Sequence, residues 1–265
     1  MSCLSRFRLI TFDVTDTLIK FRTAPGKQYG EIGALFGVNQ DDHHDLIANF
    51  KANWRKMNRA HPNFGLKTKI GEREWWRRLI RGTFDAHPLT DDKVNNMTNY
   101  LLDLYKTSSC WQLTYGAMDF LNFLKLQQQF GSQHGKYEPH FKLGVISNFD
   151  SRLDVLLRNM KLNHYFDFVL GSYQAGVEKP DKEIFKIAMK QSELKDLKPE
   201  ECLHIGNTPL TDYFGPRKSS WYSLLIHERS AAKLREKYGE KIEDHHVYQN
   251  FIDLHKDISS DYIKW

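Results

Sequence analysis

The 265-residue sequence predicts an α/β fold, in which a parallel sheet has helices on both faces and a small helical bundle is inserted after the first strand. Two observations support this class. From residue 108 onward, short apolar segments typical of buried strands alternate with amphipathic segments typical of helices. Residues 20–107 instead show one helical pattern after another, without the alternation of strands. We therefore expect two domains, a core of residues 1–19 and 108–265 and a helical domain of residues 20–107.

The first strand is predicted at residues 7–13, where the apolar run LITF ends at Asp13. The polar segment VTDT follows, and Leu18 returns to apolar character. Ligands of parallel α/β sheets bind beyond the carboxyl ends of the strands. A carboxylate at that position is therefore the first candidate for a reactive group.

Four helices are predicted between residues 20 and 107. Each segment shows apolar residues at helical spacing, and Thr90 or Asp91 can cap the last of them. Trp54, Trp75 and Trp76 are most simply core residues of this bundle. The four segments begin near Gly26, Asp41, Glu72 and Leu89.

Strands and helices alternate in the remaining sequence, which should bring Asp13, Ser147 with Asn148, and Asn207 to one crevice at the carboxyl edge of the sheet. A polar loop is expected at residues 130–140. Strands are predicted at 141–148, 167–172, 202–207 and 221–227, and helices at 119–130, 151–160 and 181–192, with Asp150 or Ser151 capping the second helix.

The residue types around that crevice suit a cation and a phosphate. Pro180 is expected in the first turn of a helix, which leaves Lys179 in the preceding loop. Asp212 follows the strand at 202–207 by one short loop. Two carboxylates, a lysine and free amides at helix N-termini suit a divalent cation and a phosphate-like anion. Asp13 could then attack phosphorus, while the metal and Lys179 offset the charge.

Four short motifs follow one another in an order that resembles the haloacid dehalogenase (HAD) superfamily. They are FDVTDTL (12–18), GVISN (144–148), EKPD (178–181) and HIGNTPLTD (204–212). The resemblance covers nearly the whole chain. It implies a Rossmann-like core, a helical cap made by the inserted bundle, and a hydrolase that cleaves a small phosphorylated metabolite through an aspartyl-phosphate intermediate.

The same resemblance assigns roles to individual residues. It implies that Mg²⁺ is the cofactor. Asp16 stands where the family often has Gly, and we expect it to face solvent or to cap its turn. His204 is most simply a packed strand residue. Asp13 and Lys179 would be catalytic, with Asp13 as the nucleophile; Ser147, Asn148 and Lys179 would bind the phosphate; and Asp13, the carbonyl of Thr15, Asn207 and Asp212 would hold or orient the metal.

Two positions depart from the pattern of this family. Its phosphatases have an acid/base Asp where this chain has Thr15, and losing general acid–base catalysis typically slows a reaction ~10²–10⁴-fold. Asn207 stands where the fourth motif usually has Asp, which removes a negative charge from the cation site and weakens Mg²⁺ binding. Three interpretations stay open: a slow phosphatase, a non-catalytic protein with a regulatory or binding role, and metal-free displacement at carbon as in dehalogenases.

Composition disfavours several other classes. The net charge is only +5 and the basic residues are scattered, so we expect no nucleic-acid partner. Cys3, Cys110 and Cys202 are far apart and form no CxxC motif, which indicates a reducing compartment. We see no signal peptide and no stretch near the ~18 apolar residues of a membrane span. We expect a cytoplasmic or nuclear protein that binds a small phosphorylated molecule, and the sequence indicates no protein partner.

Overall fold

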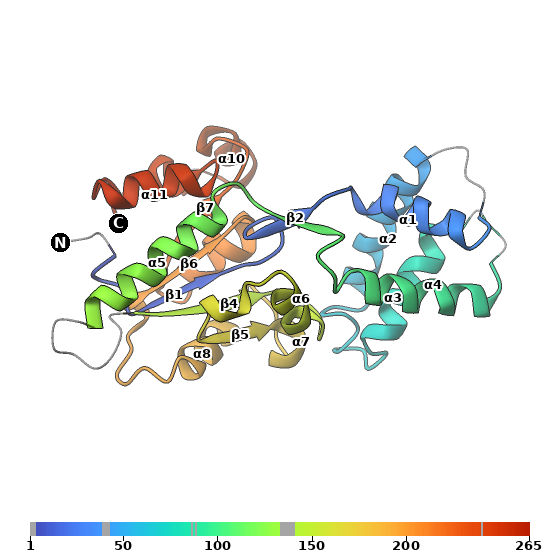
Figure 1. The fold of residues 1–265 in the computed structure, drawn as a ribbon, viewed down its shortest axis with the longest axis horizontal. Helices are drawn as coiled ribbons and strands as arrows, with labels where there is room; N and C mark the ends of the chain where they lie inside the picture. Colours follow the sequence, from blue (N-terminus) through green and yellow to red (C-terminus); the bar gives the residue numbers. More distant parts are fainter. Residues whose placement is uncertain (1–3, 39–42, 86, 88, 133–140, 240) are drawn as a thin grey trace. The chain divides into compact units, whose positions relative to one another are not determined.

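The structure is a computed structural model that describes residues 4–38, 43–85, 87, 89–132, 141–239 and 241–265 (Figure 1). The chain forms two compact units. The α/β unit comprises Met1–Lys20, Leu113–Asn148 and Leu162–Trp265, and the helical unit comprises Phe21–Gln112 and Phe149–Lys161. The segment 149–161, which the sequence analysis expected in the core, is thus grouped with the helices.

The α/β unit is built on a six-stranded parallel sheet, which confirms the predicted fold class. The strand order is β5-β4-β1-β6-β7-β8. Every residue of β1 is buried, as expected for a strand covered on both faces. The strands are β1 (Leu9–Phe12), β4 (Lys142–Ser147), β5 (Phe168–Gly171), β6 (Cys202–Gly206), β7 (Tyr222–Ile226) and β8 (Val247–Tyr248).

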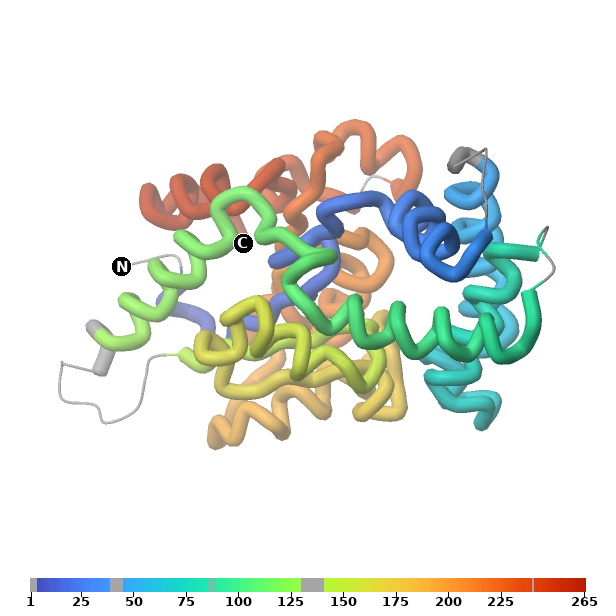
Figure 2. Tube along the Cα trace, turned by 45° about the vertical axis from the view of Figure 1, so that its right-hand side comes forward, coloured from blue at the N-terminus to red at the C-terminus, as the bar shows by residue number. Residues whose placement is uncertain are grey.

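Leu9 and Phe12 of β1 pack against helices on opposite faces of the sheet. The Phe12 ring packs against Phe120 of α5 (Ala117–Ser132) and Phe251 of α11 (Phe251–Ser259). Leu9 instead lies in a cluster with Phe185 of α8 (Lys182–Gln191). Because side chains three apart on a strand point to opposite faces, the sheet is covered on both sides. Figures 1 and 2 show α5 and α11 side by side.

Strand register brings the carboxyl ends of three neighbouring strands to the same level. Phe12 is paired with Val145 of β4 and with Ile205 of β6. The residues that follow these strands therefore share one edge of the sheet. This register places Asp13 between the Ser147 and Asn207 segments.

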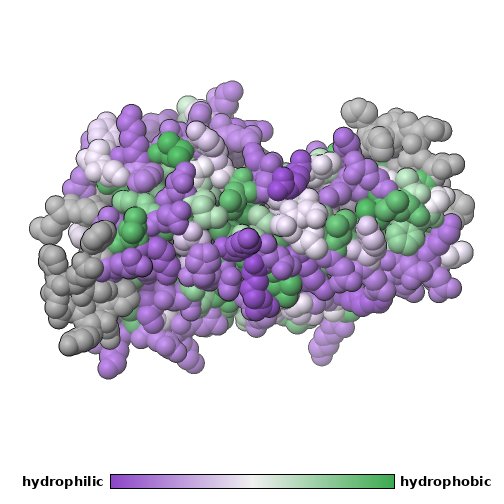
Figure 3. All heavy atoms as spheres, in the orientation of Figure 1, coloured by the Kyte–Doolittle hydropathy of each residue, from purple (hydrophilic) through white to green (hydrophobic). Residues whose placement is uncertain are grey.

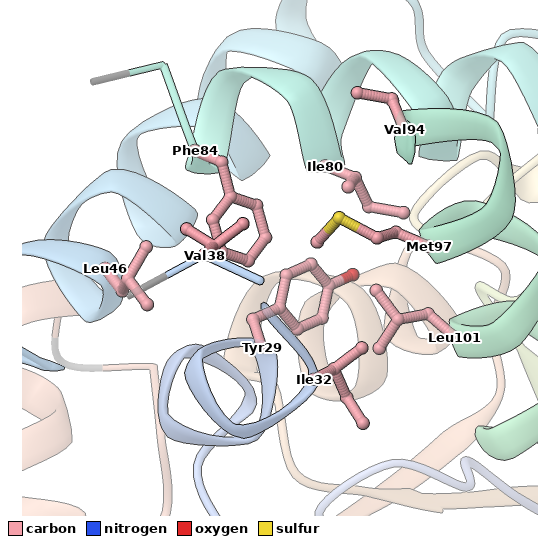
Figure 4. Close-up of a cluster of buried hydrophobic side chains, with 9 residues drawn as sticks. All are labelled: Tyr29, Ile32, Val38, Leu46, Ile80, Phe84, Val94, Met97 and Leu101. Carbon is pink, nitrogen blue, oxygen red and sulfur yellow. The ribbon is translucent and has the colours of Figure 1, made fainter. Parts of the chain in front are cut away.

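The helical unit contains the four predicted helices, α1 (Pro25–Leu35), α2 (His43–Ala60), α3 (Glu72–Thr83) and α4 (Asp91–Leu104), together with α6 (Leu153–Asn159). The Thr90 side chain accepts a hydrogen bond from the Lys93 N–H and caps α4 as predicted. An apolar core joins the helices around Tyr29, Ile80 and Met97 (Figure 4). That this unit is a cap that selects substrate stays a prediction.

The three tryptophans of the bundle differ in their surroundings. Trp75 is fully buried, while Trp54 and Trp76 are half-buried beside it. The indole Nε1 of Trp76 donates to Asp150 Oδ2 at 2.7 Å, and the Arg152 guanidinium lies over its ring at 4.7 Å from the centroid. Only Trp75 is thus a fully buried core residue, and Trp76 ties α3 to the segment before α6.

Several predicted boundaries were wrong for local reasons. The helix after Pro180 begins only at Lys182, because the Asp181 carboxylate accepts from the Glu183 N–H and acts as the N-cap. The N-cap of α6 is Arg152, and Asp150 binds the Arg152 N–H and guanidinium instead. Helix α5 continues to Ser132, into the expected loop, of which residues 133–140 lie outside the described part.

Short strands were missed as well. Strands β2 (Ile19–Phe21) and β3 (Trp111–Leu113) form a two-stranded sheet, and β8 adds two residues to the main sheet. Segments of two or three residues are too short to show alternation. The shorter elements of the α/β unit are α7 (Ser172–Ala175), α9 (Phe214–Arg217), α10 (Ala231–Tyr238), 3₁₀ turns at Asn163–Tyr165, Pro199–Glu201 and Asp244–His246, and a π-turn at Pro209–Tyr213.

Two further features concern the cysteines and the apolar character of the helices. Cys110 and Cys202 are buried free thiols. Within the described residues, no helix combines the length and the apolar character needed to cross a membrane. The face in Figure 3 is largely hydrophilic, with hydrophobic residues interspersed, as is ordinary for protein surfaces.

Candidate functional site

Asp13 lies directly beyond β1, and its carboxylate is nearly buried. Its backbone N–H donates to the Ile205 carbonyl at 2.9 Å, which holds the residue against β6. Oδ1 accepts from Lys179 Nζ at 2.9 Å, and Oδ2 accepts a longer hydrogen bond from the Thr17 hydroxyl at 3.4 Å. The residue is 7% exposed. The carboxylate is therefore held most closely by the lysine.

Lys179 is the centre of the site. Its Nζ lies 2.7 Å from Asp212 Oδ1 and donates to the Ile146 carbonyl at 2.7 Å, in addition to its bond to Asp13. An ammonium has three donors, and all three are used here. The side chain is 1% exposed. Lys179 thus links the ends of β1, β4 and β6.

The residues after β4 position this lysine. The Asn148 side chain accepts from the Lys179 N–H at 2.8 Å and donates to the Lys179 carbonyl at 2.9 Å. Ser147 is buried at the end of β4 and hydrogen-bonds to the Asp13 carboxylate. The structure brings both residues to Asp13 and Lys179; their predicted contacts with a phosphate stay a prediction.

Both carboxylate oxygens of Asp212 are engaged by protein donors. Oδ1 binds Lys179, and Oδ2 accepts from the N–H groups of Asn207 at 3.1 Å and Thr208 at 2.8 Å. Gly206 permits this approach, because a Cβ at that position would lie 2.5 Å from Asp212 Cβ. The geometry therefore suits Asp212 to holding Lys179 and the loop, rather than to direct metal coordination.

Asn207 and the turn after Asp13 complete the site. Asn207 Oδ1 lies 3.5 Å from Thr17 Oγ1, the hydroxyl that also approaches Asp13 Oδ2. Thr15 is half-buried, and its turn is closed by the Asp16 N–H, which donates to the Ile19 carbonyl at 2.7 Å. Asp16 is exposed and has a φ of +58°, a left-handed conformation that Asp tolerates better than most residues. Asp16 faces solvent, as expected.

The charges in the site leave a net negative balance, because two carboxylates share one ammonium. Burial raises the pKa of Asp13, and its attraction to Lys179 does not offset this. Burial would also raise the pKa of Asp212, but Lys179 and then His204 hold that pKa well below its usual range. Burial would lower the pKa of Lys179, but Asp13 and Asp212 keep it raised. The lysine stays charged, and the remaining negative charge favours a bound cation near Asp13.

Sequence reasoning missed one member of the site. His204 is buried, as expected, but its Nε2 lies 3.4 Å from both Lys179 Nζ and Asp212 Oδ1. Burial, followed by the Lys179 charge, lowers its pKa to about 4, so the imidazole is neutral at pH 7. His204 on β6 pairs with Thr11 of β1, and Thr11 lies two residues before Asp13. This place near the ends of neighbouring strands is the signal that could have revealed His204.

The oxygen atoms near Asp13 fit a magnesium ion. Mg²⁺ is commonly held by one or two carboxylates, other oxygen ligands and substrate phosphate, with several waters retained. Asp13 Oδ2 and Asn207 Oδ1 both approach the Thr17 hydroxyl, at 3.4 Å and 3.5 Å. The carbonyl of Thr15 belongs to the same turn. With the negative balance of the site, this donor set suits a divalent cation.

The sequence is similar to known proteins over most or all of its length. Residues 7–215 match the family model of haloacid dehalogenase-like hydrolases. The chain is 51% identical to the Rhythmically expressed gene 2 protein of Drosophila melanogaster over 269 residues, with 100% of each chain covered. It is 33% identical to Haloacid dehalogenase-like hydrolase domain-containing protein 3 of Xenopus laevis, with 92% of each covered.

A solved structure shares the fold at low sequence identity. It is a magnesium-bound structure of YfnB, a Bacillus subtilis protein named as a HAD-hydrolase. Its TM-score is 0.65 and its identity 18%, with 96% of this chain and 99% of that chain covered. At this identity the likeness concerns the fold alone.

Proposed function

This chain belongs to the haloacid dehalogenase-like hydrolase family, and on that premise we propose that it is a slow, Mg²⁺-dependent phosphatase of small phosphorylated metabolites. The observation that carries the proposal is the position of Lys179 between Asp13 and Asp212. This lysine holds Asp13 Oδ1 and so orients the carboxylate that would act as the nucleophile. The three widely spaced cysteines support a reducing compartment for the reaction, the cytoplasm or the nucleus.

In the proposed reaction, a carboxylate oxygen of Asp13 forms a bond to phosphorus while the bond to the leaving oxygen breaks, and water then hydrolyses the aspartyl phosphate. Ser147 and the N–H of Asn148 hold the phosphoryl oxygens, and the charge of Lys179 beside Asp13 offsets theirs. Asp13, the Thr15 carbonyl and Asn207 would hold Mg²⁺, which supplies further charge neutralisation when bound. Asp212 and neutral His204 keep Lys179 charged and oriented.

Turnover should be slow because this turn has no proton-transfer group at the usual place. Thr15 has a hydroxyl whose pKa is far too high to give a proton to the leaving group or to accept one from water near pH 7. Losing general acid–base catalysis typically slows a reaction by about 10²–10⁴-fold. Asn207 is neutral where the fourth motif usually has Asp, and this further weakens metal binding.

The test is hydrolysis of a generic phosphomonoester, p-nitrophenyl phosphate, with excess MgCl₂. We expect a low rate that Asp13→Asn abolishes. Asp181→Asn, at the exposed N-cap of α8, is a matched control that changes a nearby Asp outside the site. A purified protein without Asp13-dependent turnover would refute the proposal.

A second candidate is a non-catalytic protein that keeps the fold and has a regulatory or binding role. The replacements at Thr15 and Asn207 favour it, because both fall in the one site where activity would be lost. The double variant Thr15→Asp/Asn207→Asp should then hydrolyse phosphomonoesters that the natural chain does not. We do not retain metal-free displacement at carbon, since the negative balance of the site favours a cation.

A further inference from the structure

Thr11 is a polar residue inside the buried strand β1. Its side chain is fully buried, and the other three residues of the strand are apolar. Thr11 pairs with His204 of the neighbouring strand β6 and lies two residues before Asp13. A buried hydroxyl is costly unless it forms a hydrogen bond, so the partners of Thr11 indicate what the hydroxyl does at this position.

Two acceptors lie near the Thr11 hydroxyl, which has one hydrogen to donate. His204 Nδ1 lies 2.9 Å from Thr11 Oγ1, and the Leu203 carbonyl oxygen lies 3.3 Å from it. Hydrogen bonds from a hydroxyl to an oxygen usually span about 2.5–3.0 Å, so the bond to the carbonyl is the weaker choice. The distances therefore favour a hydrogen bond that Thr11 donates to His204 Nδ1.

The second ring nitrogen of His204 lies between Lys179 and Asp212. Nε2 is 3.4 Å from both Lys179 Nζ and Asp212 Oδ1. The three hydrogens of the Lys179 ammonium are used at 2.7–2.9 Å by two carboxylates and a backbone carbonyl, so none is left for Nε2. A bare lone pair on Nε2 would face a carboxylate oxygen and be repelled by it. Nε2 therefore carries a hydrogen and donates it to Asp212 Oδ1.

The two ends of the imidazole are linked, because a neutral ring carries only one hydrogen. The ring of His204 is fully buried and lies 3.4 Å from the Lys179 ammonium, and both conditions disfavour a second positive charge. With the hydrogen on Nε2, the lone pair is on Nδ1, where it accepts from Thr11. A hydroxyl on the far side of the ring thus sets the state of the nitrogen that faces the site.

We propose that Thr11 is a positioning residue of the candidate site, whose hydroxyl fixes His204 in the tautomer that donates to Asp212 Oδ1. Its role in turnover rests on the proposed phosphatase function, whereas the tautomer itself does not. Oδ1 of Asp212 then binds an imidazole N–H beside the Lys179 ammonium, while Oδ2 binds two backbone amides. A carboxylate held in this way keeps Lys179 in place beside Asp13.

Nuclear magnetic resonance of protein labelled with ¹⁵N at histidine reads this tautomer directly. In a long-range ¹H–¹⁵N spectrum at pH 7, a protonated ring nitrogen has a pyrrole-like shift and a bare one has a pyridine-like shift. We expect Nε2 of His204 to be pyrrole-like and Nδ1 to be pyridine-like, and the signals that His204→Gln removes provide the assignment. Thr11→Val, which keeps the shape but lacks the hydroxyl, should lose this pattern, and Thr11→Ser should keep it.

The matched control is Thr98→Val on α4. Thr98 is also fully buried, and its hydroxyl donates to the Val94 carbonyl at 2.7 Å, so the control removes a similar group elsewhere. It should leave the His204 signals unchanged. Thr11→Ala repeats the comparison with a smaller side chain if valine disturbs the packing. A natural protein with Nδ1 protonated, or with both nitrogens protonated, would overturn the inference, as would the natural pattern in a protein that lacks the Thr11 hydroxyl.

Turnover of p-nitrophenyl phosphate tests the role of Thr11 in the reaction. Because Thr11 acts through His204 and not on the substrate, Thr11→Val should lower kcat about tenfold and change KM less than about twofold, as expected for one lost hydrogen bond. Thr11→Ser should restore kcat, and Thr98→Val should retain it. Equal losses in the serine and valine variants would assign the effect to packing and overturn the positioning role. If the natural protein has no turnover, the phosphatase proposal fails and the spectra alone decide the inference.

Discussion

Lys179 Nζ lies 2.9 Å from Asp13 Oδ1, in a site where the lysine side chain is 1% exposed. The contact joins two residues that are 166 positions apart in the chain. It also sets the charge of the whole site, because Asp212 binds the same ammonium from the other side. The properties expected of the protein follow from this shared cation.

Lys179→Met should destabilise the protein strongly. The substitution leaves Asp13 and Asp212 as two buried carboxylates without a counter-charge, and removing one partner of a buried pair typically costs about 3–5 kcal/mol. Urea unfolding at pH 7 measures the loss. Lys179→Met/Asp212→Asn should recover part of it, since one uncompensated charge is removed. A single variant as stable as the natural protein would mean that the lysine does not hold these carboxylates.

Stability should decrease as the pH falls from 6.5 to 4. His204 has a folded pKa of about 4 against an ordinary value of 6.5, so only the unfolded chain binds its proton in this window. Its contribution is present above pH 6.5, is lost towards pH 4, and amounts to roughly 3 kcal/mol at most. His246, whose pKa is also about 4, adds to the slope.

Urea unfolding of natural protein and His204→Gln at several pH values in this window tests that assignment. The variant should show a shallower loss of stability on acidification, with the His246 contribution retained. The lowered pKa of Asp212 acts only below the ordinary carboxyl range and does not enter this window. Parallel pH profiles for the two proteins would show that His204 is not held neutral.

Thr15→Asp should increase phosphatase turnover. A carboxyl group at this half-buried turn can pass protons to the leaving group, and general acid–base catalysis is worth about 10²–10⁴-fold. Steady-state kinetics with p-nitrophenyl phosphate measures the gain. Thr15→Asn, similar in size but unable to transfer protons, is the matched control. An equal rise in both variants would attribute the gain to shape and not to proton transfer.

Asn207→Asp should tighten Mg²⁺ binding. The new carboxylate adds a charge beside the Thr17 hydroxyl that Asp13 also contacts, and ligand charge increases affinity for hard divalent ions. Isothermal titration of metal-free protein with MgCl₂ gives the two dissociation constants. Thr208→Asp places the same charge on the exposed next residue as a control. Unchanged affinity in Asn207→Asp would remove residue 207 from the metal site.

Much of the sheet could be predicted from sequence, because each long strand is an apolar run followed by polar residues. The run LITF before Asp13 and the run before Ser147 are examples. Strands β2 and β3 could not be found, since three residues carry no pattern. The start of α8 was placed too early because Asp181 is the N-cap, so that Pro180 lies before the helix and not in its first turn. The residue at which a helix begins can depend on a single hydrogen bond of this kind.

The candidate site was predictable as a set of residues but not as a set of contacts. Motif order indicates that Asp13 and Lys179 lie in one site. Nothing in the sequence shows that the two carboxylate oxygens of Asp212 bind Lys179 and two backbone amides. Nor does it show that His204 contacts that lysine. Those features depend on side-chain directions at the ends of neighbouring strands, which the three-dimensional packing determines.

The most direct test of the central claim is a crystal structure of the protein with beryllium fluoride and Mg²⁺. We expect beryllium bonded to the Asp13 carboxylate, with Lys179 retained between Asp13 and Asp212 and the magnesium ion beside Asn207. The adduct would mimic the aspartyl phosphate and identify Asp13 as the nucleophile. Electron density that shows an unmodified Asp13, under conditions that saturate the protein with both ligands, would contradict the account.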